Sequence, residues 1–252
     1  MKLAIMILLA LMSAGCASSG RDAQQQSSVD KTASAKIHTE LAAAYYGDQR
    51  YAVALDELKV AMSMNSKYAP AYDVRGLVYM ALLEDKKAEA DFERSIDLDS
   101  NNSGARNNYG WFLCQRGREK ESMEQFMEAV KNPLYATPEK AYLNAGLCSL
   151  KSGKIIVAES YLQKALYLQP KMVEALLGMA ELSYAKGDYA GAKSYFLRVS
   201  RIGSQLSASD LFLAIRVEHK LRDKNAEASY MLQLRKRYPD SRETQLMLSG
   251  ER

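Results

Sequence analysis

The chain has 252 residues, a length typical of one domain or of two small ones. With 48% hydrophobic and 25% charged residues, it is too apolar for a disordered chain and too charged for a protein that crosses a membrane many times. The 34 Lys and Arg residues exceed the 30 Asp and Glu residues by only four, so the charge gives no reason to expect a nucleic-acid partner.

The first 15 residues have the pattern of a bacterial lipoprotein signal peptide. Lys2 precedes ten apolar residues, about half the length that a membrane-spanning helix needs. The sequence Ser-Ala-Gly-Cys at 13–16 resembles the cleavage site of such signals, although leucine is usual where Ser13 stands. The alternative is an ordinary secretory signal that happens to contain a cysteine.

If the lipoprotein interpretation holds, Cys16 becomes an acylated N-terminus, and several acyl chains anchor a protein firmly to a membrane. Ala17 follows the cysteine, and resemblance to enterobacterial lipoproteins then implies sorting to the periplasmic face of the outer membrane. Residues 16–34 are predicted to be the acylated cysteine and a flexible polar tether, with Val29 as the only large aliphatic residue.

The remainder of the chain repeats with a period near 34 residues. A small residue recurs at spacings of 34, 34, 36, 34 and 34, and a large apolar residue follows four positions after each one. A second small residue stands twelve positions before each of them. The first small series is Ala54, Ala88, Ser122, Ala158, Ala192 and Ala226, and the second is Ala42, Gly76, Gly110, Gly146, Ala180 and Ala214.

This pattern resembles the tetratricopeptide repeat, a 34-residue pair of antiparallel helices, A and B, which approach closely at the small positions. It predicts an all-α superhelix of six helix-turn-helix repeats, with residues 241–252 as a short C-terminal capping helix. The repeat array covers residues 35–240. Its six units are 35–68, 69–102, 103–138, 139–172, 173–206 and 207–240.

In this repeat family, positions 2, 5, 9 and 12 of each unit generally point to the concave inner wall. A second apolar set beyond the core positions would leave an exposed surface of the kind that binds partners, and Trp111 is of a residue type enriched at binding hot spots. Each of these residues could instead belong to the core. The large apolar residues at these positions are Tyr46, Leu77, Met80, Trp111, Leu143, Leu147, Leu150, Leu177 and Tyr184.

The sequence contains none of the common catalytic or cofactor-binding motifs. It contains no phosphate-binding loop, dinucleotide fingerprint, nucleophile elbow or zinc-protease motif, and its two histidines, His38 and His219, lie at opposite ends of the repeats. We therefore expect no catalytic, cofactor or metal site and no small-molecule substrate. Cys114 and Cys148 lie at nearly equivalent places in adjacent units; they form either a disulfide or two free buried thiols.

Some short sequences within the repeats indicate a particular family of repeat proteins. The sequence NNYGWFLC at 107–114, the Asn-Ala-Gly-Leu-Cys at 144–148 and the Pro-Leu-Tyr insertion between them resemble the PilF/PilW family of type IV pilus biogenesis lipoproteins. The resemblance extends over essentially the whole chain. It implies a non-enzymatic pilotin that binds the outer-membrane secretin PilQ and promotes its localisation and multimerisation. The alternative is a scaffold lipoprotein for outer-membrane protein assembly or for recruiting cell-wall enzymes.

Overall fold

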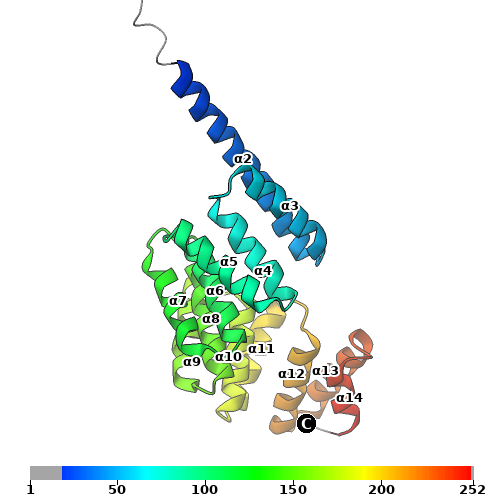
Figure 1. Ribbon diagram of the computed structural model, residues 1–252. Coiled ribbons are helices and arrows are strands. Elements are labelled where there is room, and N and C mark those ends of the chain that lie inside the picture. The colour runs from blue at the N-terminus through cyan, green and yellow to red at the C-terminus, as the bar shows by residue number, and fades with distance from the viewer. Residues whose placement is uncertain (1–18, 251–252) are drawn as a thin grey trace, which may run out of the picture. The chain divides into compact units, whose positions relative to one another are not determined.

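The computed structural model of the protein describes residues 19–250, so the predicted signal peptide and Cys16 lie outside the described residues. These residues form thirteen α-helices and no strand (Figure 1). They divide into two compact units, the first ending at Asn108 and the second beginning at Tyr109. None of the helices in this part of the chain is both long enough and apolar enough to cross a membrane.

The first unit contains the first two predicted repeats. Helices α2 and α3 form one antiparallel pair and α4 and α5 form the next, and the start of α6 completes the unit. The bounds are α2 Ser19–Gly47, α3 Tyr51–Met64, α4 Ala69–Ala81, α5 Asp85–Leu98 and α6 Ser103–Gln115.

The second unit contains the rest of α6, its partner α7 and three further complete pairs. The predicted capping helix is present as α14, which follows the sixth pair directly. The bounds are α7 Glu119–Lys131, α8 Pro138–Lys151, α9 Ile155–Leu168, α10 Val173–Ala185, α11 Tyr189–Ile202, α12 Ala208–Leu221, α13 Lys224–Arg237 and α14 Arg242–Leu248.

The recurring small residues are where helix A meets helix B. A Cβ atom added at Gly146 would lie 2.7 Å from Leu162 Cγ, and one added at Gly76 would lie 2.8 Å from the Phe92 ring. Distances this short do not occur between real Cβ atoms and their neighbours. The pairing of a small residue on helix A with a large one on helix B is therefore a packing requirement.

The turns between helices A and B need a left-handed residue. Gly153 has φ 72°, a conformation that costs glycine little because it has no side chain. Leu83 occupies the corresponding turn of the second repeat with φ 60°, and its side chain is 77% exposed. A glycine in this turn is thus the favoured choice of this fold and not a necessity.

The prediction of a flexible tether over residues 16–34 is wrong for its larger part. Helix α2 begins at Ser19 and runs without a break into the first repeat. The segment contains no proline, and its Ala, Gln and Lys residues have high helix propensity. Because the first repeat already supplies a helical end, this segment extends it without a new nucleation step.

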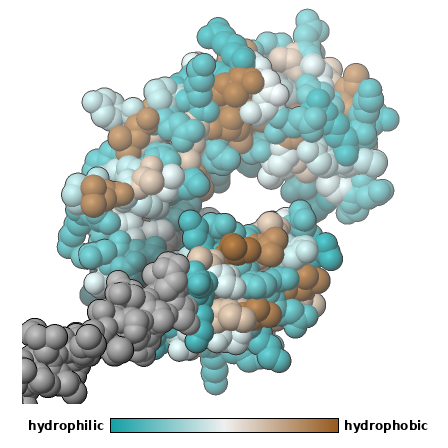
Figure 2. All heavy atoms as spheres, turned by 90° about the horizontal axis from the view of Figure 1, so that it is seen from above, coloured by the Kyte–Doolittle hydropathy of each residue, from teal (hydrophilic) through white to brown (hydrophobic). Residues whose placement is uncertain are grey.

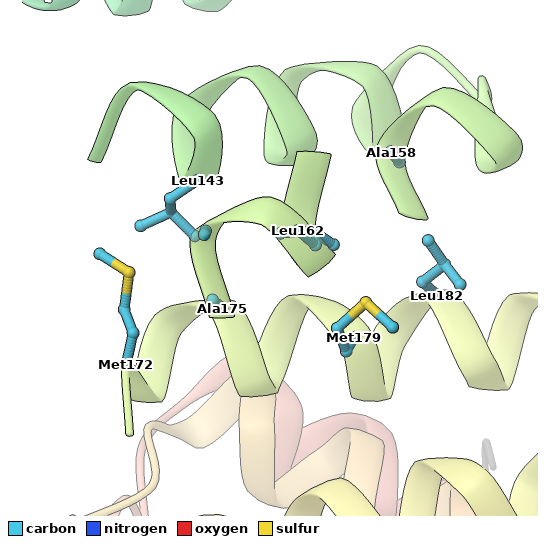
Figure 3. Packing of buried hydrophobic residues seen from close by; sticks show 8 residues of the cluster. Leu143, Ala158, Leu162, Met172, Ala175, Met179 and Leu182 are labelled. Atoms are coloured by element: carbon cyan, nitrogen blue, oxygen red, sulfur yellow. The ribbon is translucent and has the colours of Figure 1, made fainter. Parts of the chain in front are cut away.

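A continuous core follows the stacked helices in each unit. One cluster in the second unit joins α8, α9 and α10, and its larger buried side chains include Leu162, Met179 and Leu182. Figure 3 shows Leu143 pointing into this cluster, near Met172. The side chain of Leu143 is only 7% exposed, so the prediction that it lines a partner groove is wrong, and Leu143 is a core residue.

Candidate partner-binding surface

Three of the predicted inward residues lie in the first unit, on α2 and α4. Tyr46, Leu77 and Met80 are all half-buried. Tyr46 packs against the core cluster of the first two helix pairs, with its ring 6.0 Å from that of Tyr51. Burial, with a smaller effect of Tyr51, raises the pKa of Tyr46. All three side chains thus remain partly accessible to a partner, and Tyr46 also packs against the core.

A carboxylate stands on the same face of α4, one turn before Leu77. Asp73 accepts hydrogen bonds from Asn108 Nδ2 at 3.1 and 3.0 Å, one to each carboxylate oxygen. Burial raises the pKa of Asp73 to about 6, although the hydrogen bond from Asn108 acts in the opposite direction. The residue falls at position 5 of its repeat, an inward position, but the apolar pattern that predicts the inner wall does not include a carboxylate.

Five predicted inward residues remain partly accessible in the second unit. They lie on the A helices α6, α8 and α10, and each also contacts a core cluster. Trp111 packs beside the buried Phe126. None of the five is fully exposed, so they form a half-buried wall and not a separate exposed patch. The five residues are Trp111, Leu147, Leu150, Leu177 and Tyr184.

A disulfide joins the two A helices next to Trp111. Cys114 on α6 and Cys148 on α8 are bonded at an S–S distance of 2.10 Å, with their Cα atoms 5.9 Å apart. Both residues are buried, at 3% and 1% exposure. Of the two states that the sequence allowed, the structure has the disulfide, and it holds the wall near Trp111 in one arrangement.

A cavity of about 580 Å³ opens between α10, α12 and α14, and we call it the α14 cavity. Tyr184 lines it as one of the predicted inward residues. The guanidinium of Arg216 lies over the Tyr184 ring, 4.6 Å from its centroid. The remaining lining residues are Glu181, Ala185, Ser209, Asp210, Phe212, Leu213, Arg242, Glu243 and Leu246.

Phe212, Leu213 and Arg216 were missed by the sequence analysis. In the last repeat, the inward positions 5 and 9 are Leu211 and Ile215, but both are completely buried in a cluster that includes Met247 of α14. The capping helix therefore covers the expected face of α12, and a different face of that helix lines the cavity. The repeat period could not reveal this because α14 is not part of the repeat.

The described residues provide no place for a metal ion. Within residues 19–250, no group of three or more His, Cys, Asp and Glu side chains could hold one. His38 Nδ1 lies 2.6 Å from a Glu57 oxygen, and His219 Nδ1 lies 3.2 Å from one of Glu227. Each histidine thus has a carboxylate neighbour within its own unit.

Apolar exposure alone does not single out the inner wall. On the face drawn in Figure 2, hydrophobic residues reach the surface in small separate patches among hydrophilic ones. The most exposed large apolar side chains are Leu134, in the insertion before α8, and Tyr167 and Ile156 on α9, at 88%, 86% and 84%. The inner wall is distinguished instead by repeated half-buried positions and by the α14 cavity.

Comparison with known proteins agrees with this architecture. Residues 69–102 and 139–172, which are the second and fourth predicted units, match the Tetratricopeptide repeat family. The chain is 30% identical over 242 residues to the Type IV pilus assembly protein PilF of Pseudomonas aeruginosa, and the alignment covers 96% of each chain.

Two solved structures are similar over most of the chain. The crystal structure of PilW, described as a widely conserved type IV pilus biogenesis factor, matches with a TM-score of 0.77 and 34% identity, covering 85% of this chain and 98% of that one. The structure of Pseudomonas aeruginosa PilF matches with a TM-score of 0.76 and 28% identity, covering 88% and 99%. The chain belongs to the PilF/PilW family of tetratricopeptide-repeat proteins of type IV pilus biogenesis.

Proposed function

We propose that the protein is a non-enzymatic pilotin: a lipoprotein of the outer membrane that binds the PilQ-like secretin and promotes its localisation and multimerisation there. The observation that carries the proposal is the 30% identity to PilF over 96% of both chains. Near-complete coverage matters because a match limited to one or two repeats would indicate only the fold, which hosts many functions.

The inner wall supplies the binding surface in this proposal. Leu77 and Met80 in the first unit, and Trp111 in the second, are half-buried, so each has a supported position and a free face. Rigid, partly accessible apolar and aromatic side chains are the residue types that dominate binding energies at protein interfaces. A secretin segment that covered such side chains in either unit would bury apolar area without first ordering a flexible loop.

The proposed lipid anchor would place the protein at the membrane. Acylation at Cys16 would hold the protein at the membrane where the secretin must assemble, and Ala17 after it favours the outer membrane. The helical start of α2, from Ser19 to the first repeat at residue 35, would then act as a spacer. At a rise of 1.5 Å per residue, its sixteen residues span about 24 Å.

The second candidate function is a scaffold lipoprotein for outer-membrane protein assembly or for recruiting cell-wall enzymes. The same fold and anchor would serve it, because stacked repeats present a binding surface for many kinds of client. The family assignment favours the pilotin, since the relatives that match the chain from end to end carry pilus functions in their names.

Deletion of the gene tests the two candidates against each other. A pilotin deletion should remove secretin multimers from the outer membrane and abolish surface pili and twitching, while leaving resistance to detergents and osmotic shock unchanged. A general scaffold would instead give envelope defects with other outer-membrane proteins reduced. Normal levels of secretin multimers in the deletion strain would contradict the pilotin proposal.

A further inference from the structure

The α14 cavity is lined by both apolar and charged side chains. The side chains of Phe212, Leu213 and Leu246 contribute apolar surface from α12 and α14, and Tyr184 contributes an aromatic ring from α10. Such a mixture of apolar area with a few charged groups is typical of sites that hold one extended segment in a fixed register.

The charges in the cavity lining do not cancel, because the carboxylates outnumber the guanidinium groups by three to two. Three carboxylates, from Glu181, Asp210 and Glu243, line the cavity together with the guanidinium groups of Arg216 and Arg242. Arg216 is placed over the Tyr184 ring. Within residues 19–250, Glu181 has no ion pair with any cation. The α10 side of the cavity thus presents a carboxylate without a counterion.

The second carboxylate beside Glu181 is fixed in place. Asp210 belongs to the capping box of α12: its Oδ2 accepts a hydrogen bond from the Ser207 backbone N–H at 3.0 Å, and its own N–H donates to Ser207 Oγ at 3.2 Å. The Asp210 side chain cannot change its conformation without the loss of this cap. Desolvation and, to a smaller extent, the charge of Asp210 raise the pKa of Glu181, as expected for a carboxylate that lies near another carboxylate.

We propose that the α14 cavity binds a partner segment in which a lysine or arginine lies between apolar residues. The basic side chain would approach Glu181 and Asp210 and relieve their repulsion, and its apolar neighbours would cover Phe212 and Leu246. This inference adds to the proposed function the chemistry of one binding site. It rests on the proposed function only for the statement that the inner wall binds a partner.

Peptide binding to the full-length chain tests the proposal. Three fluorescein-labelled peptides share the sequence Gly-Leu-X-Leu-Gly-Leu, in which X is lysine, glutamine or glutamate, and their affinities are measured by fluorescence anisotropy. The lysine peptide should bind about five- to tenfold more tightly than the glutamate peptide, the effect expected of one or two partly exposed ion pairs. Glu181→Gln should reduce this preference, and Glu181→Lys should reverse it.

Glu124→Lys is the matched control, because it makes the same change of charge at an exposed position on α7 away from the cavity. It should leave the preference for lysine unchanged. The proposal is overturned if none of the peptides binds, if all three bind equally, or if Glu124→Lys changes the preference as much as Glu181→Lys does. Any of these results can occur while deletion of the gene still removes secretin multimers, so failure of this inference is distinguishable from failure of the proposed function.

Discussion

The side-chain amide of Asn108 donates hydrogen bonds through Nδ2 to both carboxylate oxygens of Asp73, at 3.1 and 3.0 Å. The contact joins the end of the first unit to the inward face of α4, one turn from Leu77. Despite this hydrogen bond, burial dominates and raises the pKa of Asp73 from 3.8 to about 6.

This pKa predicts a specific dependence of stability on pH. Between pH 4 and pH 6 the folded chain holds a proton on Asp73 that the unfolded chain has released, so the contribution of Asp73 to the free energy of unfolding falls as pH rises through this window. Asp73→Asn carries no titrating group. Its free energy of unfolding relative to the native chain should therefore increase by about 1–3 kcal/mol from pH 4 to pH 7. Urea unfolding of both chains at each pH measures this difference; a constant difference would contradict the assignment.

Gly146→Ala should destabilise the fold by about 1–3 kcal/mol, the usual cost of overpacking a core. The added methyl group would lie 2.7 Å from Leu162 Cγ and 3.1 Å from the Leu162 backbone nitrogen, and the backbone cannot move aside cheaply. Gly47→Ala is the control, because an added Cβ there meets nothing within 4 Å. Thermal unfolding followed by circular dichroism compares the two variants. Equal melting temperatures would show that the close approach of helices A and B is not required.

Loss of the disulfide should cost about 3–4 kcal/mol, since it closes a loop with a sequence separation of 34 residues. Denaturant unfolding with and without a reductant measures this loss, and a Cys114→Ala/Cys148→Ala chain, which should not respond to the reductant, is the control. Alkylation followed by mass measurement provides an independent check. Modification of both thiols in the folded chain without a reductant would contradict the disulfide.

Replacing Asp91 by alanine should destabilise the first unit by about 1–3 kcal/mol, because it leaves the partly buried Arg75 guanidinium without its carboxylate partner. Arg75 Nε and Nη2 donate to the two Asp91 carboxylate oxygens at 2.6 and 2.7 Å, and Asp91 is only 6% exposed. The exposed pair of Lys131 and Glu128 serves for comparison, and Glu128→Ala should change stability by less than about 1 kcal/mol. Similar losses in the two variants would show that the buried pair has no special role.

Cys16→Ala should release the protein from the membrane fraction, because the proposed acyl chains are its only anchor in this account. Ser18→Ala, two residues away, should remain bound and controls for changes near the processing site. Fractionation of cells followed by immunoblotting measures both. Membrane association of Cys16→Ala equal to that of the native chain would contradict the lipid anchor.

The repeat units could be predicted from the sequence because one steric rule recurs: a residue as small as Gly146 must face one as large as Leu162. The half-buried inner wall was harder to predict. Leu143 and Leu147 both occupy inward positions, yet Leu143 is buried in the cluster with Met172, because the loop leading into α10 covers it. The position of a residue within a repeat predicts which way its side chain points, but not how deeply that side chain is buried.

Two further features depend on parts of the chain outside the repeat pattern. The polar composition of residues 19–34 suggested a coil, but this segment extends an existing helix, which needs no apolar face to persist for a few turns. Met247 of α14 covers Leu211 and Ile215, so the accessible face of α12 is the one that carries Phe212. The 34-residue repeat period predicts neither the helix over residues 19–34 nor the covering of α12 by α14.

Binding of the secretin by the inner wall can be measured by complementing the deletion strain with Leu77→Glu and, separately, with Trp111→Glu. Heat-stable secretin multimers in outer-membrane fractions are then quantified by immunoblot, with Leu83→Glu at an exposed turn as the control and circular dichroism of each purified variant as the test of folding. We predict that the two inner-wall variants fold and lose most of the multimers, while Leu83→Glu restores them. Native multimer levels with both folded inner-wall variants would show that the inner wall does not bind the secretin.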